Sequence, residues 1–135
     1  MNILSNYERG FIAACIDTDG YITLSKRSGT GCSRIVGVGF ANNSILFLNR
    51  IQYILGTNKK LINKKGTNNY KFRLSPSESY DLLKQISLII KEHRRIIAIE
   101  LYELGRSAFG MNKHSPRLEE HVKKTETLIK KFYSK

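Results

Sequence analysis

Several residue types that define common protein classes are scarce in this sequence. Its 135 residues include two cysteines, two prolines and no tryptophan, and 11 acidic residues face 23 lysines and arginines. Cys15 lies in an apolar stretch and Cys32 in a Gly/Ser-rich turn, so we expect two thiols and no disulfide framework. His93, His114 and His121 are too scattered for a zinc site. Any metal ion would therefore be held by oxygen ligands.

Long apolar runs are missing as well. No stretch approaches the ~20 apolar residues of a membrane-spanning helix. The first residues, Met1 to Asn6, lack the basic start and apolar run of a secretory signal. We therefore expect an intracellular protein with no membrane partner. Lysine, isoleucine and asparagine are abundant, which is typical of A·T-rich genomes and makes a mitochondrion or chloroplast one candidate location.

The excess of basic residues is the first positive feature. The formal net charge is +12, which favours a polyanionic partner, and nucleic acid is the foremost of these. The length suits one domain with a hydrophobic core, and we find no repeat or low-complexity linker. Residues 1–135 are therefore predicted to form a single domain.

The N-terminal part of the chain predicts a helix that is apolar on nearly every side. It spans residues 6–17, with Asn6 as the expected N-cap and an apolar run from Phe11 to Ile16. One small domain cannot easily enclose such a helix, whereas a second copy of the chain could. The pattern thus predicts a homodimer.

After Gly20 the apolar period changes to two, which predicts antiparallel strands. One hairpin is expected from residues 21–27 and 33–41, and another from 59–65 and 70–74. The residues expected to face the core are Ile22, Leu24, Val36, Val38, Phe40, Tyr70, Phe72 and Leu74. The opposite face is then small, polar or basic.

Helices are expected between and after the hairpins. The first spans 44–55, with Asn43 or Ser44 as cap and Ile45, Leu48, Ile51 and Leu55 as its apolar stripe. Ser75-Pro76-Ser77-Glu78 indicates a helix start, and that helix is expected to run to about Ile90. Two more are expected over 93–107 and 116–133. The predicted fold is α+β, with the order α-β-β-α-β-β-α-α-α.

Residues 12–20, Ile-Ala-Ala-Cys-Ile-Asp-Thr-Asp-Gly, resemble the LAGLIDADG motif of homing endonucleases. The small residues and the final Asp-x-Asp-Gly agree, whereas Ala14 and Cys15 depart mildly from the pattern. The predicted element order is also similar to that family's domain as far as about Ser107. The resemblance implies an αββαββα core whose antiparallel sheet forms a DNA-binding saddle, followed by C-terminal helices.

The resemblance also implies an activity. It implies an intron-encoded, sequence-specific endonuclease that cuts both strands of a long pseudo-palindromic DNA site and leaves 3′ extensions. Mg²⁺ is the expected ion, and Mn²⁺ or Ca²⁺ could occupy the same site. The implied catalytic residues are Asp19, Asn42 and Lys91, and the implied metal ligands are Asp19 and Gly20. The implied dimer interface contains Phe11, Ala13, Ala14, Ile16 and Asp17.

Simple physical chemistry agrees with the metal hypothesis. Asp19 ends a predicted helix, where the macrodipole disfavours a carboxylate by about 0.3 to 1 kcal/mol, and a divalent cation would offset this cost. The alternatives are structural: a polar turn for 17–20, an Asx cap for Asn42, and an ordinary solvated helix-end lysine for Lys91.

The outward face of the two hairpins combines lysines and arginines with small polar side chains. This mixture suits contacts with DNA phosphates and with base edges in a groove. The residues predicted to contact DNA are Tyr21, Thr23, Ser25, Arg27, Ser33, Ile35, Lys59, Lys60, Lys64, Lys65, Lys71 and Arg73. Lys123, Lys124, Lys130 and Lys131 more simply form a solvated helix face.

Two other classes of function remain open at this point. A relative without nuclease activity could bind intron RNA as a maturase, or bind DNA as a regulator. A structural basic protein, such as a ribosomal component, would explain the charge but not the motif, and it predicts a monomer with no metal dependence.

Overall fold

The structure is a computed structural model that describes residues 1–26, 34–108 and 116–134. The elements follow in the order α1 (Asn6–Thr18), β1 (Gly20–Lys26), β2 (Arg34–Asn42), α2 (Ile45–Leu55), β3 (Ile62–Asn63), β4 (Tyr70–Arg73), α3 (Pro76–Gln85), α4 (Glu92–Ala108) and α5 (Pro116–Tyr133). The expected α+β class and the expected order of elements are confirmed. The predicted turn at 28–31, with Arg27, Cys32, Ser33 and His114, lies outside the described residues.

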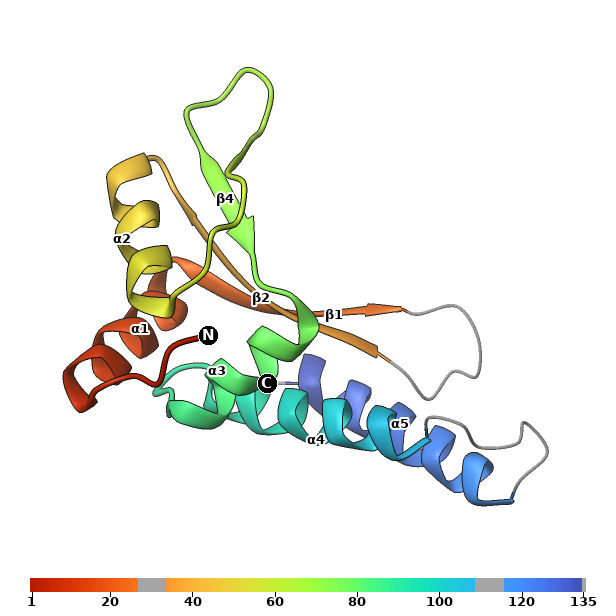
Figure 1. Cartoon of the computed structure of the whole chain (residues 1–135). Coiled ribbons are helices and arrows are strands. Elements are labelled where there is room, and N and C mark those ends of the chain that lie inside the picture. The colour runs from red at the N-terminus through yellow and green to blue at the C-terminus, as the bar shows by residue number, and fades with distance from the viewer. Residues whose placement is uncertain (27–33, 109–115, 135) are drawn as a thin grey trace.

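Four antiparallel strands form one sheet in the order β1-β2-β4-β3. Figure 1 shows α1, α3, α4 and α5 on one side of the sheet. The β1–β2 hairpin and β4 extend from the centre of the sheet in different directions (Figure 1). The opposite face carries no described helix. One face is therefore packed and the other is open.

The packed face holds the hydrophobic core. Ile22, Val36, Val38, Phe40, Phe72 and Leu74 are buried there, as the period of two predicted. Phe40 and Phe72 are register partners on β2 and β4, and their rings stack at 5.3 Å between centroids. This cross-strand aromatic pair joins the two hairpins at the centre of the sheet.

The N-cap of α1 lies one residue before the residue that the sequence suggested. Ser5, not Asn6, is the N-cap: its Oγ accepts from the Glu8 amide at 3.2 Å. The Glu8 carboxylate in turn accepts from the Ser5 amide at 2.9 Å, which completes a capping box. The Ser-x-x-Glu spacing carried this signal, and the expectation of Asn6 overlooked it.

Helix α1 is amphipathic and not buried all round. Ile12, Cys15 and Ile16 lie in the core, whereas Gly10 and Ala14 are exposed on another side. Tyr7 continues that second side and is 83% exposed. The protein's own sheet thus covers one face of α1 and leaves a stripe of mostly small residues open.

Strand β3 contains only Ile62 and Asn63, so the expected strand over 59–65 is wrong at its start and end. The backbone of Lys59 is held by the buried side chain of Gln52 on α2, through N–H to Oε1 at 2.5 Å and Nε2 to C=O at 3.0 Å. These groups are therefore not available to a strand ladder. In α2 itself, Leu48, Ile51 and Leu55 are buried as expected, but Ile45 is exposed.

Helix α3 ends at Gln85 and does not continue to Ile90 as expected. Beyond this end, the backbone is bound by Asp17, near the end of α1. Its two carboxylate oxygens accept hydrogen bonds from the amides of Ile89, at 2.8 Å, and Lys91, at 3.0 Å. Amides bound in this way are not available to a continuing helix.

A second contact returns from this segment to α1. The Lys91 ammonium donates to the carbonyl oxygens of Ile16, at 2.7 Å, and Gly20, at 2.8 Å. A cation at a helix C-terminus is favoured by the macrodipole. Asp17 and Lys91 thus tie α1 and the start of α4 together reciprocally, and we call this pair the α1–α4 latch.

Within the described ranges, no helix is both long and apolar enough to cross a membrane.

The α1–α4 latch predicts a pH-dependent stability. Partial desolvation opposes ionisation of Asp17, but the amides of Ile89, Ile90 and Lys91 and the Lys91 charge outweigh it, so the pKa of Asp17 lies below its usual 3.8. A lowered folded pKa means that the stabilisation is present above the usual pKa and is lost as pH falls through the folded pKa. We expect Asp17→Asn to lower the free energy of unfolding by about 1 to 2 kcal/mol at pH 7, with the difference shrinking in acid.

Urea denaturation from pH 2 to 7 would measure this difference. Asp81→Asn, on the exposed side of α3, is the matched control and should change little. Equal stability of Asp17→Asn and the unaltered protein at pH 7 would disprove the role of the latch.

Candidate functional site

The end of α1 presents the motif's second aspartate to solvent. Asp19 is the C-cap of α1, and its amide donates to the Cys15 carbonyl at 2.9 Å. Its own carbonyl accepts from Ala41 on β2 at 3.3 Å, which fixes the backbone against the sheet. The carboxylate itself is exposed. An exposed anion at a helix C-terminus stands where a cation is favoured.

Asn42, at the end of β2, lies beside this carboxylate. Its Nδ2 donates to Asp19 Oδ2 at 3.2 Å, while its Oδ1 accepts from the Ser44 amide at 2.8 Å. The second bond is the local Asx arrangement that precedes α2, whose N-cap is Ser44. The amide oxygen of Asn42 thus serves the start of α2, and its amide nitrogen faces Asp19. A catalytic role for Asn42 stays a prediction.

Lys91 lies under the same turn but directs its ammonium at backbone carbonyls. Burial lowers the pKa of Lys91, an effect that Asp17 opposes, Arg94 reinforces and Asp19 opposes. The ammonium contacts the carbonyl oxygens of Ile16 and Gly20, and the predicted catalytic role of Lys91 stays a prediction. Lys91 holds the end of α1 in position.

Gly20 joins α1 to β1 in a space that admits no side chain. A Cβ at this position would lie 2.8 Å from the Ile16 Cα and 3.1 Å from the Gly39 carbonyl oxygen. Its own carbonyl oxygen already accepts the Lys91 ammonium. A metal ion at this oxygen would stand beside a positive charge, so the expected metal contact of Gly20 is not favoured by the geometry.

Other chemistry at this end of α1 is limited. Burial, with a contribution from Asp19, raises the pKa of the Cys15 thiol to about 11, so it is an inert, protonated core group. No cluster of three or more His, Cys, Asp or Glu residues that could hold a metal occurs in the described part of the chain. At this end of α1, the Asp19 carboxylate therefore supplies the oxygen atoms that are open to a cation, since the Asn42 amide oxygen already accepts from Ser44.

The outer face of the sheet holds most of the residues predicted to contact DNA. Tyr21, Thr23, Ser25 and Ile35 are half-buried, and Lys71 and Arg73 are exposed. Register pairs Tyr21 with Gly39 and Gly39 with Arg73, so these positions form one row across three strands. Arg27 and Ser33 lie outside the described residues.

The lysines of the second hairpin separate into two groups. Lys60, Lys64 and Lys65 are exposed around β3 and the turn that follows it. Lys59 instead forms an ion pair with Glu78 of α3, with 2.8 Å between Nζ and Oε1. Its charge is partly neutralised within the chain, which sets it apart from the other three.

The residues predicted for a dimer interface also differ in their placement. Ala14 is exposed and Ala13 is half-buried, whereas Phe11 packs edge-on against Phe47 of α2. Ile16 is completely buried in its own core and has no surface for a partner. Asp17 is engaged in the α1–α4 latch. The exposed side of α1 includes Tyr7 and Gly10, which lie one helical turn before Phe11 and Ala14.

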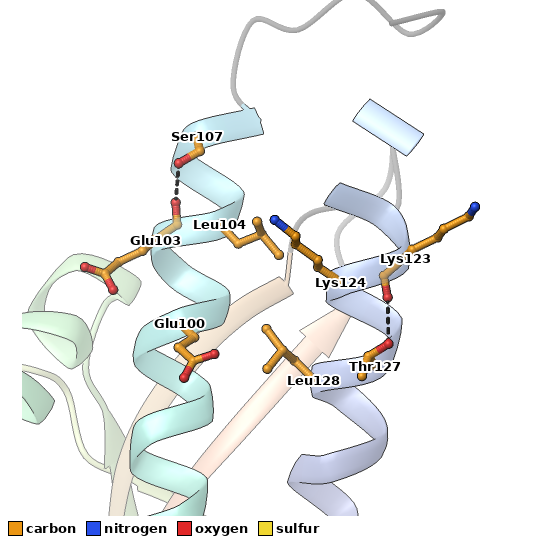
Figure 2. Close-up of a pocket in the computed structure, with 8 residues that line it drawn as sticks. All are labelled: Glu100, Glu103, Leu104, Ser107, Lys123, Lys124, Thr127 and Leu128. Atoms are coloured by element: carbon orange, nitrogen blue, oxygen red, sulfur yellow. Dashed lines mark hydrogen bonds between the residues drawn. The ribbon is translucent and has the colours of Figure 1, made fainter. Parts of the chain in front are cut away.

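A hollow of about 520 Å³ lies between α4 and α5, remote in the chain from the motif. Figure 2 shows Leu104 and Leu128 between the two helices, with Glu100 and Glu103 on one side and Lys124 reaching across from the other. None of the residues that line it belongs to the Asp19, Asn42 and Lys91 cluster. Lys123, Lys124, Lys130 and Lys131 are exposed, as expected for a solvated helix face.

Comparisons with known proteins agree with this architecture. Residues 6–97 match the family described as LAGLIDADG-like domain. No relative was found among curated proteins.

Solved structures share the fold at low sequence identity. The homing endonuclease I-CvuI, solved with the I-CreI target DNA in the presence of Mg, has a TM-score of 0.68 and 14% identity, covering 96% of this chain and 84% of its own. The archaeal intron-encoded homing endonuclease I-Vdi141I, complexed with DNA, has a TM-score of 0.64 and 16% identity, covering 91% and 84%.

A larger relative is matched over part of its length. The LAGLIDADG homing endonuclease I-LtrWI, bound to target DNA, has a TM-score of 0.66 and 14% identity, and the match covers 98% of this chain but 50% of that protein. In this chain, the family match over residues 6–97 includes the motif and the described strands β1 to β4. The chain therefore belongs to the LAGLIDADG family, with the fold of its homing endonucleases.

Proposed function

We propose that this protein is a sequence-specific DNA endonuclease that acts as a homodimer and requires a divalent metal ion. The observation that carries the proposal is the exposed Asp19 carboxylate at the end of α1, which accepts a hydrogen bond from Asn42 of β2. The family relatives I-CvuI and I-Vdi141I, both solved with DNA, support duplex DNA as the substrate.

The residues at the end of α1 fit a hard cation. A carboxylate oxygen is the ligand that Mg²⁺, Mn²⁺ or Ca²⁺ prefers, and Asp19 offers one at a helix terminus that favours positive charge. A bound divalent ion would supply Lewis acidity to the scissile phosphate. Asn42 orients one carboxylate oxygen, and Lys91 holds the backbone that carries it.

A dimer would complete the site. Each chain supplies one Asp19, and two α1 helices packed along their exposed sides would bring the two carboxylates together. Gly10 and Ala14 allow close approach of helix backbones, and a Cβ at Gly10 would meet nothing within 4 Å in its own chain. The proposed interface therefore contains Tyr7, Gly10, Ala13 and Ala14, and Ile16 is excluded from it.

The open face would read DNA. Arg73 can donate paired hydrogen bonds to guanine, while Thr23 and Ser25 offer hydroxyls to either kind of edge. Lys60, Lys64 and Lys65 would contact phosphates, as point charges that contribute affinity without sequence preference.

The overall test is a cleavage selection from a randomised duplex library in Mg²⁺ and in EDTA. Recovery of DNA that is bound but never cut would indicate a binding protein and not a nuclease.

Asp19→Asn is expected to abolish cleavage and leave folding and DNA affinity intact. The amide keeps the size of the side chain but removes the charge that a hard cation requires. Affinity for the selected DNA should be measured in Ca²⁺ and strand scission in Mg²⁺.

Two variants serve as controls for Asp19→Asn. Asp81→Asn should cut normally, and Asp17→Asn should cut at temperatures where it remains folded. Near-normal scission by Asp19→Asn would reject the mechanism, and its loss in folded Asp17→Asn alone would mean that the other aspartate binds the metal.

The proposed interface predicts that Ala14→Glu gives monomers that cannot cleave. A glutamate here places two like charges and two bulky side chains between helices that must pack closely. Sedimentation velocity measures the association state, and Thr127→Glu on α5 is a matched control that should leave the dimer intact. A dimer of Ala14→Glu that is as stable as the unaltered protein would remove α1 from the interface.

Replacing the arginine that would read bases and replacing a lysine that would contact phosphates should weaken DNA binding in different ways. Arg73→Ala should cost about 1 to 3 kcal/mol and relax preference at one position in each half-site. Lys64→Ala should weaken all sequences alike and lower the slope of log K against log salt by about one per protomer. Lys59→Ala is the matched lysine control and should change the slope less, because Glu78 already pairs with it. Unchanged sequence preference in Arg73→Ala would show that another face reads the DNA.

A further inference from the structure

A pair of glycines on β2 shapes the middle of the outer sheet face. A Cβ at Gly39 would lie 2.3 Å from Tyr21 Cζ and 2.4 Å from its hydroxyl oxygen. A Cβ at Gly37 would lie 2.8 Å from Thr23 Oγ1 and 3.3 Å from Arg73 Cδ. The Tyr21 ring and the Arg73 stem therefore lie across β2, from the strands on either side, instead of standing away from the sheet.

Beyond the Tyr21 ring there is a hollow of about 230 Å³. It is lined by Tyr21, Ile62, Lys71, Phe72 and Arg73. Ile62 and Lys71 are register partners, and Lys71 and Arg73 alternate with the buried Phe72, so the hollow opens on the outer face. Tyr21 of β1 and Ile62 of β3 supply apolar groups to the hollow, and Lys71 and Arg73 of β4 add two exposed cations.

Ile62 is the unusual member of this set. It is 56% exposed and stands in a segment that is otherwise rich in lysine, Lys59 to Lys65. A single exposed isoleucine is ordinary on a protein surface. Here, however, Ile62 lines the same hollow as the ring of Tyr21, which lies flat on the sheet because Gly39 has no side chain.

We propose that this hollow holds the 5-methyl group of a thymine in the DNA major groove. Among the base edges displayed there, thymine alone combines an apolar methyl with an adjacent acceptor, O4. The methyl would lie against Tyr21 and Ile62, and O4 would accept from Lys71 or Arg73. Adenine and cytosine would instead direct an amino donor at these cations, and guanine has acceptors but no methyl. The inference rests on the proposed binding of duplex DNA by this face.

The test replaces thymine by deoxyuridine, which removes only the methyl group. Once the library has yielded a preferred duplex, each thymine is replaced in turn, symmetrically in both half-sites, and affinity is measured in Ca²⁺. One position should lose about three- to fivefold in affinity per half-site, as expected for one buried methyl, and the others much less. Ile62→Ala should bind the thymine and uracil duplexes equally.

Ile35→Ala is the matched control, because Ile35 lies on the same sheet face, on β2, but does not line the hollow. It should keep the difference between thymine and uracil. If no thymine is sensitive, or if Ile62→Ala keeps the full difference, the hollow does not hold a thymine methyl. Failure to recover any preferred duplex would instead reject the proposed sequence-specific function, so the two failures are distinguishable.

Discussion

The carboxylate of Asp17 and the ammonium of Lys91 connect two helix ends that lie more than seventy positions apart in the chain. The Asp17 carboxylate accepts from the Ile89 and Lys91 amides before α4. The Lys91 ammonium donates to the carbonyl oxygens of Ile16 in α1 and Gly20 at the start of β1, so each charge binds backbone beside the other helix. Strand β2 holds the same end of α1 from another side, because the Asp19 carbonyl oxygen accepts from the Ala41 amide at 3.3 Å.

The motif's two aspartates therefore have different environments although only Thr18 separates them. Asp17 is bound by backbone amides, and Asp19 faces solvent with Asn42 beside it. The first environment stabilises the fold and the second leaves a carboxylate free for a ligand. At the end of α1, the macrodipole disfavours the exposed Asp19 carboxylate and favours a cation beside it.

The two faces of the sheet show a similar division. Large apolar side chains fill the inner face, and on the outer face Gly37 and Gly39 leave room for Tyr21 and Arg73 to lie across β2. At the centre of the outer face, these side chains consequently lie along the sheet, and Arg73 adds a positive charge. Exposed lysines lie at the β3–β4 end.

The sequence by itself determined the order of elements, the inner face of the sheet and the family, because apolar period, capping residues and the motif are all local signals. Only the tertiary structure decided where α3 ends, how short β3 is and which lysine is paired. Asp17 binds the Ile89 amide, which a helix continuing to Ile90 would need. Gln52 occupies the backbone of Lys59, and Glu78 forms an ion pair with its side chain. These partners come from other elements, and local periodicity contains no information about which distant side chain will compete for a backbone group.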